Sequence, residues 1–264
     1  MFGKKYVRGI VFGLAGLGMV ASTAVAEEAK PTADLTVGAL SQYVWRGWAY
    51  SKDSVVLQPS MTVGYKDFSV NLWGNLDTDR WDNDGADSNN WTETDLTMSY
   101  SWVMGPVNMS AGYIYYAFDS ATDTQEVYLT ATLNTFLSPT LKVYRDIDHY
   151  AGWYTTLGIS HAVPVTKELS LNLGAQVSYL VADEASSYAD PSDANDEYSN
   201  FHDGLISASM KIPVNQYVSV TPQLYYSFPL SSDAEDRLKA DNTTYIGRAD
   251  DDFVYGGVAV SLAF

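Results

Sequence analysis

The stretch from Glu168 to Val181, ELSLNLGAQVSYLV, alternates apolar and polar side chains along almost its whole length. Leu169, Leu171 and Leu173 fall at every second position, with short polar residues between them. A period of two places successive side chains on opposite faces of a β-strand, so this stretch predicts a strand with one apolar and one polar face. Segments 54–65 and 217–228 show the same alternation.

Turn signals divide the chain after residue 34 into twelve such segments. They span residues 34–46, 54–65, 68–76, 92–103, 107–117, 125–134, 140–147, 151–161, 168–182, 201–212, 217–228 and 252–264. No composition break separates them, and no apolar stripe with helical spacing follows the first 26 residues. We therefore expect one all-β domain over residues 27–264, a 12-stranded antiparallel barrel.

The connections between these segments alternate in length. Those after even-numbered segments are tight, such as Lys66-Asp67, and most of the others are long, such as 183–200 and 229–251. Strand ends joined by tight turns lie on one side of the barrel, so the long loops gather on the other side. Of the 32 acidic residues, all but five lie in the long-loop half; the five are Glu27, Glu28, Asp34, Asp67 and Glu168.

The N-terminus has the features of an export signal. Lys4, Lys5 and Arg8 precede an uncharged stretch over 9–26, which ends in the small residues Ala24-Val25-Ala26. This order of basic, apolar and small residues is typical of a secretory signal peptide, so we expect residues 1–26 to be removed. The mature chain is then exported.

Composition excludes several classes of protein. The chain has no cysteine, which rules out disulfides, thiolate metal sites and a cysteine nucleophile. A net charge of −17 argues against binding to nucleic acid. With 46% hydrophobic residues and a mean hydropathy of −0.13, the chain is not a bundle of membrane helices.

Strand length favours a membrane barrel over a soluble one. Strands of soluble proteins average about 5–6 residues, whereas tilted membrane strands need about 9–11. The chain ends on Phe264, preceded at steps of two by Leu262 and Val260, a pattern similar to the assembly signal of bacterial outer-membrane barrels. We therefore expect a bacterial outer-membrane location with periplasmic termini, contact with membrane lipids, and recognition of Phe264 by the barrel-assembly machinery. Aromatic residues near strand ends predict interfacial girdles; they include Tyr43, Trp45, Tyr65, Phe68, Tyr100, Trp102, Trp153, Tyr179 and Tyr226.

The polar faces of the strands supply the candidate pore residues. The candidate constriction consists of Arg46, Gln58, Trp73, Glu93, Asp95, Glu126, Tyr144 and Asp146. In the sharper interpretation, Arg46 faces the acidic members and produces a transverse field, and the excess of acid predicts a preference for cations. In the simpler interpretation, these residues are only a hydrated, hydrogen-bonded interior.

A metal site and an enzyme are weaker hypotheses. Asp82, Asp84 and Asp87 surround Gly85 as the oxygen ligands of a calcium loop do, but the twelfth-position glutamate of an EF-hand is absent. A surface Ca²⁺ site is the one cofactor hypothesis. A barrel phospholipase would need a serine and a histidine at the membrane interface, and His149, His161 and His202 lie in no recognisable nucleophile motif, so we expect no enzyme. A structural or adhesive barrel acting through its acidic loops stays open as an alternative.

The N-terminal block carries a family resemblance. Residues 41–47, Ser-Gln-Tyr-Val-Trp-Arg-Gly, are followed by Leu57-Gln-Pro-Ser60 and by Trp73-Gly-Asn75. This order resembles the N-terminal signature of the TorF-type porins, the Gcw_chp-like outer-membrane barrel proteins, although the Gly-Cys-Trp variant of that block is absent. The resemblance implies an outer-membrane pore and carries over no catalytic residue. We therefore expect a porin-like channel for passive diffusion of small hydrophilic solutes, cationic or neutral.

Overall fold

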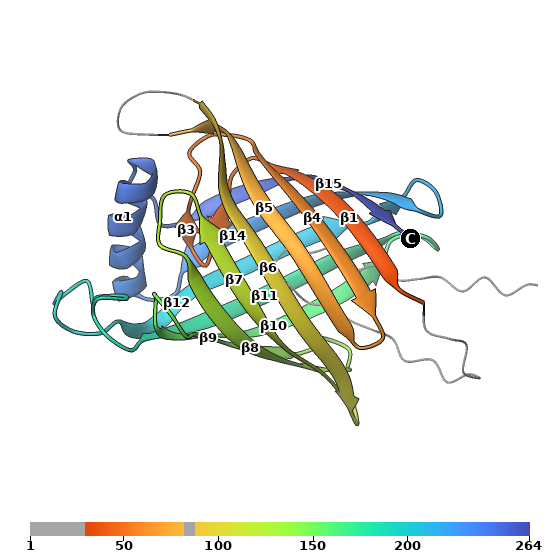
Figure 1. Ribbon diagram of the computed structural model, residues 1–264, viewed down its shortest axis with the longest axis horizontal. Helices are drawn as coiled ribbons and strands as arrows, with labels where there is room; N and C mark the ends of the chain where they lie inside the picture. Colours follow the sequence, from red (N-terminus) through yellow and green to blue (C-terminus); the bar gives the residue numbers. More distant parts are fainter. Residues whose placement is uncertain (1–29, 82–87) are drawn as a thin grey trace, which may run out of the picture.

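The computed structural model describes residues 30–81 and 88–264. Twelve long strands form one antiparallel barrel (Figure 1). They are β1 (Thr32–Leu40), β4 (Val56–Tyr65), β5 (Phe68–Arg80), β6 (Ser88–Met104), β7 (Val107–Phe118), β8 (Thr124–Leu133), β9 (Thr140–Asp146), β10 (Gly152–Pro164), β11 (Ser170–Ala182), β12 (Ser199–Met210), β14 (Val218–Pro229) and β15 (Phe253–Ala263). The 12-stranded antiparallel barrel expected from the alternation is confirmed.

The barrel is closed at both edges of the sheet. β1 pairs with the last strand, β15, from Asp34 opposite Ala263 to Leu40 opposite Gly257. β12 pairs with β14, and the short β13 (Ile212–Pro213) pairs with the beginning of β14. Closure leaves no free edge of unpaired backbone groups, which is the condition for a sheet to cross lipid.

The outer surface of the barrel is apolar. Leu129, Leu157 and Leu173 are exposed, and Leu173 has 42% of its surface accessible. Their neighbours along the same strands, such as Thr130 and Thr156, point inward and are less accessible or buried. The apolar faces of the strands therefore point outward, as expected, and the architecture is that of a bacterial outer-membrane β-barrel.

The first expected strand is shorter than its sequence pattern predicts. The segment 34–46 was expected to cross as one strand, but β1 ends at Leu40. The chain then turns inward and forms a small hairpin, β2 (Val44–Trp45) and β3 (Trp48–Ala49). Tyr43 is buried and Trp45 packs against buried rings, so neither belongs to the predicted outer girdle.

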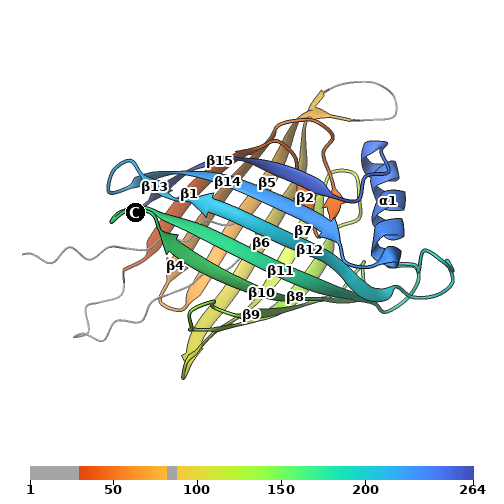
Figure 2. The ribbon, with the colours of Figure 1, turned by 180° about the vertical axis from the view of Figure 1, so that it is seen from behind.

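The long connection 229–251 contains a helix that the sequence analysis did not predict. Helix α1 (Ser232–Ile246) lies across the end of the barrel opposite the C-terminus, and both views show it there (Figures 1 and 2). Ser231 begins the helix by accepting a hydrogen bond from the Ala234 backbone N–H, and Gly247 ends it in the left-handed conformation. Within the described residues, no helix is long and apolar enough to cross a membrane.

The inner wall differs between the two ends of the barrel. Near the tight turns, short polar side chains bond to one another: Asn71 donates to Ser60 and Thr62, and Thr132 bonds to Thr140. Near the long loops, the inward side chains are large aromatic and charged groups, and many of them are buried. The candidate site lies in this second half, below α1.

Candidate functional site

The β2–β3 hairpin presents Arg46 at its tip. Arg46 and Gly47 are the two turn residues, with φ angles of 51° and 84°. Two positive φ angles in a two-residue hairpin define a type I′ turn, which matches the right-handed twist of the flanking strands. Glycine is favoured at position 47, because its φ of 84° strains other residues and a Cβ atom there would lie 3.0 Å from Leu238 Cδ1 of helix α1.

Arg46 forms a buried ion pair with the barrel wall. Its Nη1 and Nη2 atoms donate to the two carboxylate oxygens of Glu126 on β8 at 2.7 and 2.8 Å. The side chains of Arg46 and Glu126 are only 8% and 3% exposed. The hydroxyl of Tyr116 on β7 also donates to Glu126, at 2.8 Å. Burial opposes the charge of Arg46, but the adjacent Glu126 outweighs it and holds the pKa of the guanidinium well above its ordinary value.

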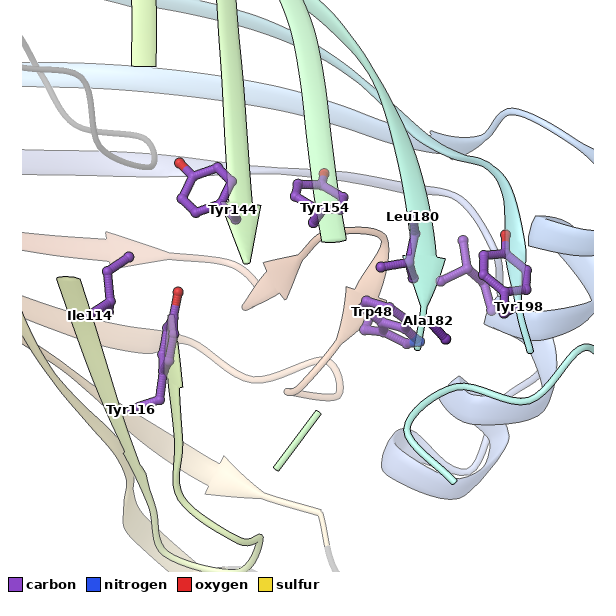
Figure 3. Packing of buried hydrophobic residues seen from close by; sticks show 9 residues of the cluster. Trp48, Ile114, Tyr116, Tyr144, Tyr154, Leu180, Ala182 and Tyr198 are labelled. Atoms are coloured by element: carbon purple, nitrogen blue, oxygen red, sulfur yellow. The ribbon is translucent and has the colours of Figure 1, made fainter. Parts of the chain in front are cut away.

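Three aromatic rings surround the same guanidinium. The Arg46 Cζ atom lies 4.1 Å from the ring centre of Trp45, 4.2 Å from that of Tyr154 and 5.0 Å from that of Tyr144. Each distance is within the range of a cation–π contact. Tyr144 and Tyr154 project from the neighbouring strands β9 and β10 (Figure 3). We call the group formed by Tyr116, Glu126, Tyr144 and Tyr154 the wall cage.

Helix α1 holds the other side of the hairpin. The indole N–H of Trp48 donates to Asp241 at 2.9 Å, and the backbone N–H of Ala49 donates to the side-chain oxygen of Asn242 at 2.9 Å. On the wall, His202 Nε2 lies 3.0 Å from the backbone oxygen of Arg46, with which it hydrogen-bonds. We call the β2–β3 hairpin and α1 together the plug. The plug lies at the long-loop end of the barrel and contacts its wall through His202.

A second group of predicted residues lies beside the plug. Tyr43 donates its hydroxyl to Glu93 at 2.9 Å, and its ring packs against Trp73 at a centroid distance of 5.7 Å. Burial, together with the negative charge of Glu93, raises the pKa of Tyr43 well above its ordinary value. Gln58 donates to Asn75 at 3.0 Å, so it forms part of the same wall.

The expected ring of acids around Arg46 is only partly assembled. The structure brings Arg46, Glu126 and Tyr144 together, but Arg46 reaches them from a turn and not from a strand of the wall. Asp146 instead accepts hydrogen bonds from the Thr124 hydroxyl and from backbone N–H groups of the following loop. Asp95 lies in register with Trp73 on β5 and Tyr116 on β7.

Sequence reasoning missed the residues that fix the hairpin. Trp48 is almost fully buried, and Tyr154 bonds through its hydroxyl to Asp203 on β12 at 2.7 Å. One signal was present: Arg46-Gly47 between two tryptophans is a two-residue turn with a glycine in a left-handed position, flanked by residues that favour strands.

A cavity of about 60 Å³ borders the wall cage. Its lining includes Arg46 and the three tyrosines of the wall cage, together with Lys142, Gln176, Asp203, Ser227 and Tyr255. The lining thus combines aromatic rings with hydrogen-bonding and charged groups.

The remaining hypotheses lie elsewhere in the chain. The proposed calcium ligands Asp82, Asp84 and Asp87, like the signal peptide, lie outside the described residues. His202 bonds through both ring nitrogens, to Arg46 and to the Tyr198 hydroxyl, and His161 bonds to a backbone oxygen near a tight turn. Both of these histidines therefore have structural contacts.

Comparison with solved structures finds other barrels. The chain is similar to an outer membrane channel from Pseudomonas putida F1, with 9% identity and a TM-score of 0.48 over 91% of this chain and 97% of that one. It is similar to the outer membrane channel DcaP of Acinetobacter baumannii, with 11% identity and a TM-score of 0.34 over 89% and 97%. It is also similar to the outer membrane protease OmpT from Escherichia coli, with 9% identity and a TM-score of 0.35 over 92% and 99%.

These likenesses concern the barrel architecture alone. They include channels and a protease, so they assign no activity to this chain. No family model matches the sequence, and a search of curated proteins by sequence finds no match. The resemblance to the TorF-type porins therefore stays a prediction.

Proposed function

We propose that the protein is an outer-membrane channel that passes small hydrophilic solutes, cationic or neutral, and that the plug closes its long-loop mouth in this structure. The observation that carries the proposal is that different parts of the chain occupy the two halves of the barrel interior. Within residues 30–81 and 88–264, short polar side chains of the strands line the tight-turn half, whereas the β2–β3 hairpin and α1 lie in the long-loop half. A barrel of twelve strands is wider than the eight whose own side chains fill the interior.

The charge of the interior supports a preference for cations. Glu93, Asp95 and Glu126 lie on inward faces of the wall, and Arg46 of the plug neutralises Glu126. Displacement of the hairpin would leave the wall with a net negative charge. Rings of acidic side chains in a pore favour the passage of cations.

The proposed orientation follows from the loops. The beginning of β1, the C-terminus and the tight turns lie at one end of the barrel, and α1 with the other described long connections lies at the opposite end (Figure 1). Outer-membrane barrels have short periplasmic turns and longer extracellular loops. We therefore place the plug at the cell surface and Phe264 in the periplasm, where the assembly machinery would meet it.

Planar-bilayer recording of the full mature barrel tests the proposal. We expect brief, low-conductance openings of the native protein and longer openings after Trp48→Ala, which removes the indole that anchors the hairpin to α1. In a salt gradient, the reversal potential should show cations passing more readily than anions. Anion preference would refute the charge argument.

The same experiment addresses a structural or adhesive role. A sealed mouth is also what such a barrel would show, and exposed acidic residues of the long connection 183–198, such as Glu184, Asp193 and Asp196, offer a surface for a partner. If the native protein and the Trp48→Ala variant are both folded, as judged by heat-modifiable migration, and neither passes current, the channel proposal fails. We propose transport and not catalysis, and lipid hydrolysis that depends on His149 or His202 would contradict this assignment.

A further inference from the structure

We propose that the wall cage is a binding site for guanidinium groups and related organic cations, and that Arg46 occupies this site from within. The inference rests on the proposed channel function for the passage of such solutes, but binding itself does not depend on it. It names the solute class that the barrel would recognise.

The site and its occupant belong to different parts of the molecule. Tyr116, Glu126, Tyr144 and Tyr154 lie on four consecutive wall strands, β7 to β10, whose positions are fixed by backbone ladders. Arg46 lies on a hairpin that pairs with no wall strand. Removal of the Arg46 side chain therefore leaves the four wall residues on their strands.

Contacts that do not involve Arg46 hold the wall cage in shape. Tyr154 is oriented by its hydrogen bond to Asp203, which also accepts from Ser178. Tyr116 is oriented by its bond to Glu126. Tyr144 packs against Tyr154 at a centroid distance of 6.2 Å. A site that is already organised loses little freedom when a ligand enters, which favours binding.

The chemistry of the wall cage selects a planar, delocalised cation. The carboxylate of Glu126 accepts two parallel N–H bonds, a geometry that matches the fork of a guanidinium. The rings of Tyr144 and Tyr154 face the same cation. Sodium and potassium ions are compact and hydrated, so they would gain less from these rings than a weakly hydrated guanidinium does. Anions would be repelled by Glu126.

A guanidinium ligand and Arg46 compete for the wall cage. The cavity of about 60 Å³ that borders the wall cage lies beside the occupied site, with Lys142, Gln176 and Asp203 in its lining. A free guanidinium compound that binds Glu126 excludes Arg46 from it, so bound ligand and docked hairpin are alternatives. A ligand that binds one of two states shifts the population toward that state. Guanidinium solutes would thus favour release of the hairpin.

Removal of the internal occupant tests the proposal. Agmatine and guanidinium chloride, below denaturing concentrations, are titrated into the refolded mature barrel in detergent at constant ionic strength, with potassium chloride as the reference salt. Binding is measured by calorimetry and by intrinsic tryptophan fluorescence, to which Trp45 at the wall cage contributes. We expect saturable binding of agmatine to Arg46→Ala, at least tenfold tighter than to the native protein, in which Arg46 competes.

Three further variants complete the design. Arg46→Ala combined with Glu126→Gln should lose most of the binding, because the carboxylate is gone. Arg248→Ala, which removes an exposed arginine paired with Asp53, should behave like the native protein. Trp48→Ala keeps Arg46 but loosens its hairpin, so it should bind agmatine with intermediate affinity, and it serves if Arg46→Ala does not fold.

The outcomes separate this inference from the channel proposal. If the folded Arg46→Ala variant, or Trp48→Ala in its place, binds agmatine no better than the native protein, the cation site is wrong. The same conclusion follows if Glu126→Gln leaves the binding unchanged. If agmatine binds but no variant passes current, the site stands and the channel proposal fails. If current passes and agmatine does not bind, the channel stands without this solute class.

Discussion

Trp48 offers the sharpest test of how the plug is held. Its side chain is 2% exposed, its ring lies 4.6 Å from that of His202 on the wall, and its indole N–H bonds to Asp241 on α1. Replacement of a buried tryptophan by alanine typically costs about 3–5 kcal/mol. Because Trp48 lies on the hairpin and outside every wall ladder, we expect Trp48→Ala to weaken docking of the plug and to leave the barrel folded.

The free-energy cost of each Trp48 substitution predicts how much more often the hairpin undocks from α1 and the wall. Each 1.4 kcal/mol changes an equilibrium about tenfold, so Trp48→Ala should raise the ratio of undocked to docked hairpin by about 10²- to 4 × 10³-fold. Trp48→Phe keeps most of the burial and loses one hydrogen bond, worth about 1 kcal/mol. Asp241 would still accept a bond from Arg237, at 2.8 Å. That variant should therefore shift the ratio only about fivefold.

Hydrogen–deuterium exchange of the backbone N–H groups in residues 44–49 measures this ratio. We expect their exchange to speed up strongly in Trp48→Ala and slightly in Trp48→Phe, while the ladder of β10 and β11 stays protected. Trp153→Ala is the matched control, because Trp153 is 44% exposed on the outer face. Equal protection of the hairpin in the native protein and in Trp48→Ala would refute the reasoning. Loss of β10–β11 protection would show that Trp48 supports the barrel as well.

The remaining predictions concern the turn, the wall and the C-terminus. Gly47→Ala should weaken docking of the plug by about 1 kcal/mol or more, because position 47 has a positive φ and a new Cβ would press on Leu238. Faster hydrogen–deuterium exchange of the hairpin would report this weakening. Unchanged protection of the hairpin would contradict the prediction. Leu129→Arg should destabilise the barrel in lipid vesicles by about 2–4 kcal/mol, measured by urea titration, whereas the adjacent inward Thr130→Arg should cost clearly less. Equal costs would contradict the assignment of the faces. Phe264→Ala should lower the amount of assembled barrel in cells without lowering its stability after refolding; normal assembly would remove Phe264 from the assembly signal.

The wall of the barrel could be predicted from sequence because its rules are local. Period-two alternation sets the face of each side chain, and the alternation of tight and long connections sets the side on which strands join. Leu173, for example, points outward as its position in the alternation requires. Neither rule depends on contacts between residues that are distant in the sequence.

The plug could not be predicted in the same way, because distant contacts decide its path. Beyond Leu40 the sequence continues to alternate, with Tyr43 and Trp45 at apolar positions, and so imitates a strand. What overrides the pattern is docking of the hairpin on a segment almost two hundred residues later: the Ala49 N–H bonds to Asn242. No local signal marks that partner.

Helix α1 was missed for a related reason. Its buried face consists of Ala234, Leu238, Asn242 and Ile246, each four residues apart, and a face with an asparagine and an alanine is a weak apolar stripe. Stronger signals were its termini. Ser231 and Gly247 are typical N-terminal and C-terminal capping residues, and Glu235 and Lys239 pair one turn apart.

The width of the barrel explains why the plug and the wall cage occur together. Side chains that project from twelve strands do not meet at the axis, so a closed mouth needs chain segments from outside the wall. Such a segment buries polar backbone groups and polar side chains, and each of them needs a partner. In the hairpin, the backbone oxygen of Arg46 hydrogen-bonds with His202, and its guanidinium donates to Glu126. An uncompensated buried carboxylate is costly, so the wall favours occupation of the wall cage by some cation at all times. Undocking of Arg46 therefore costs less free energy when another cation takes its place at Glu126, so in our proposal the closure of the barrel and the selection of its solute are coupled.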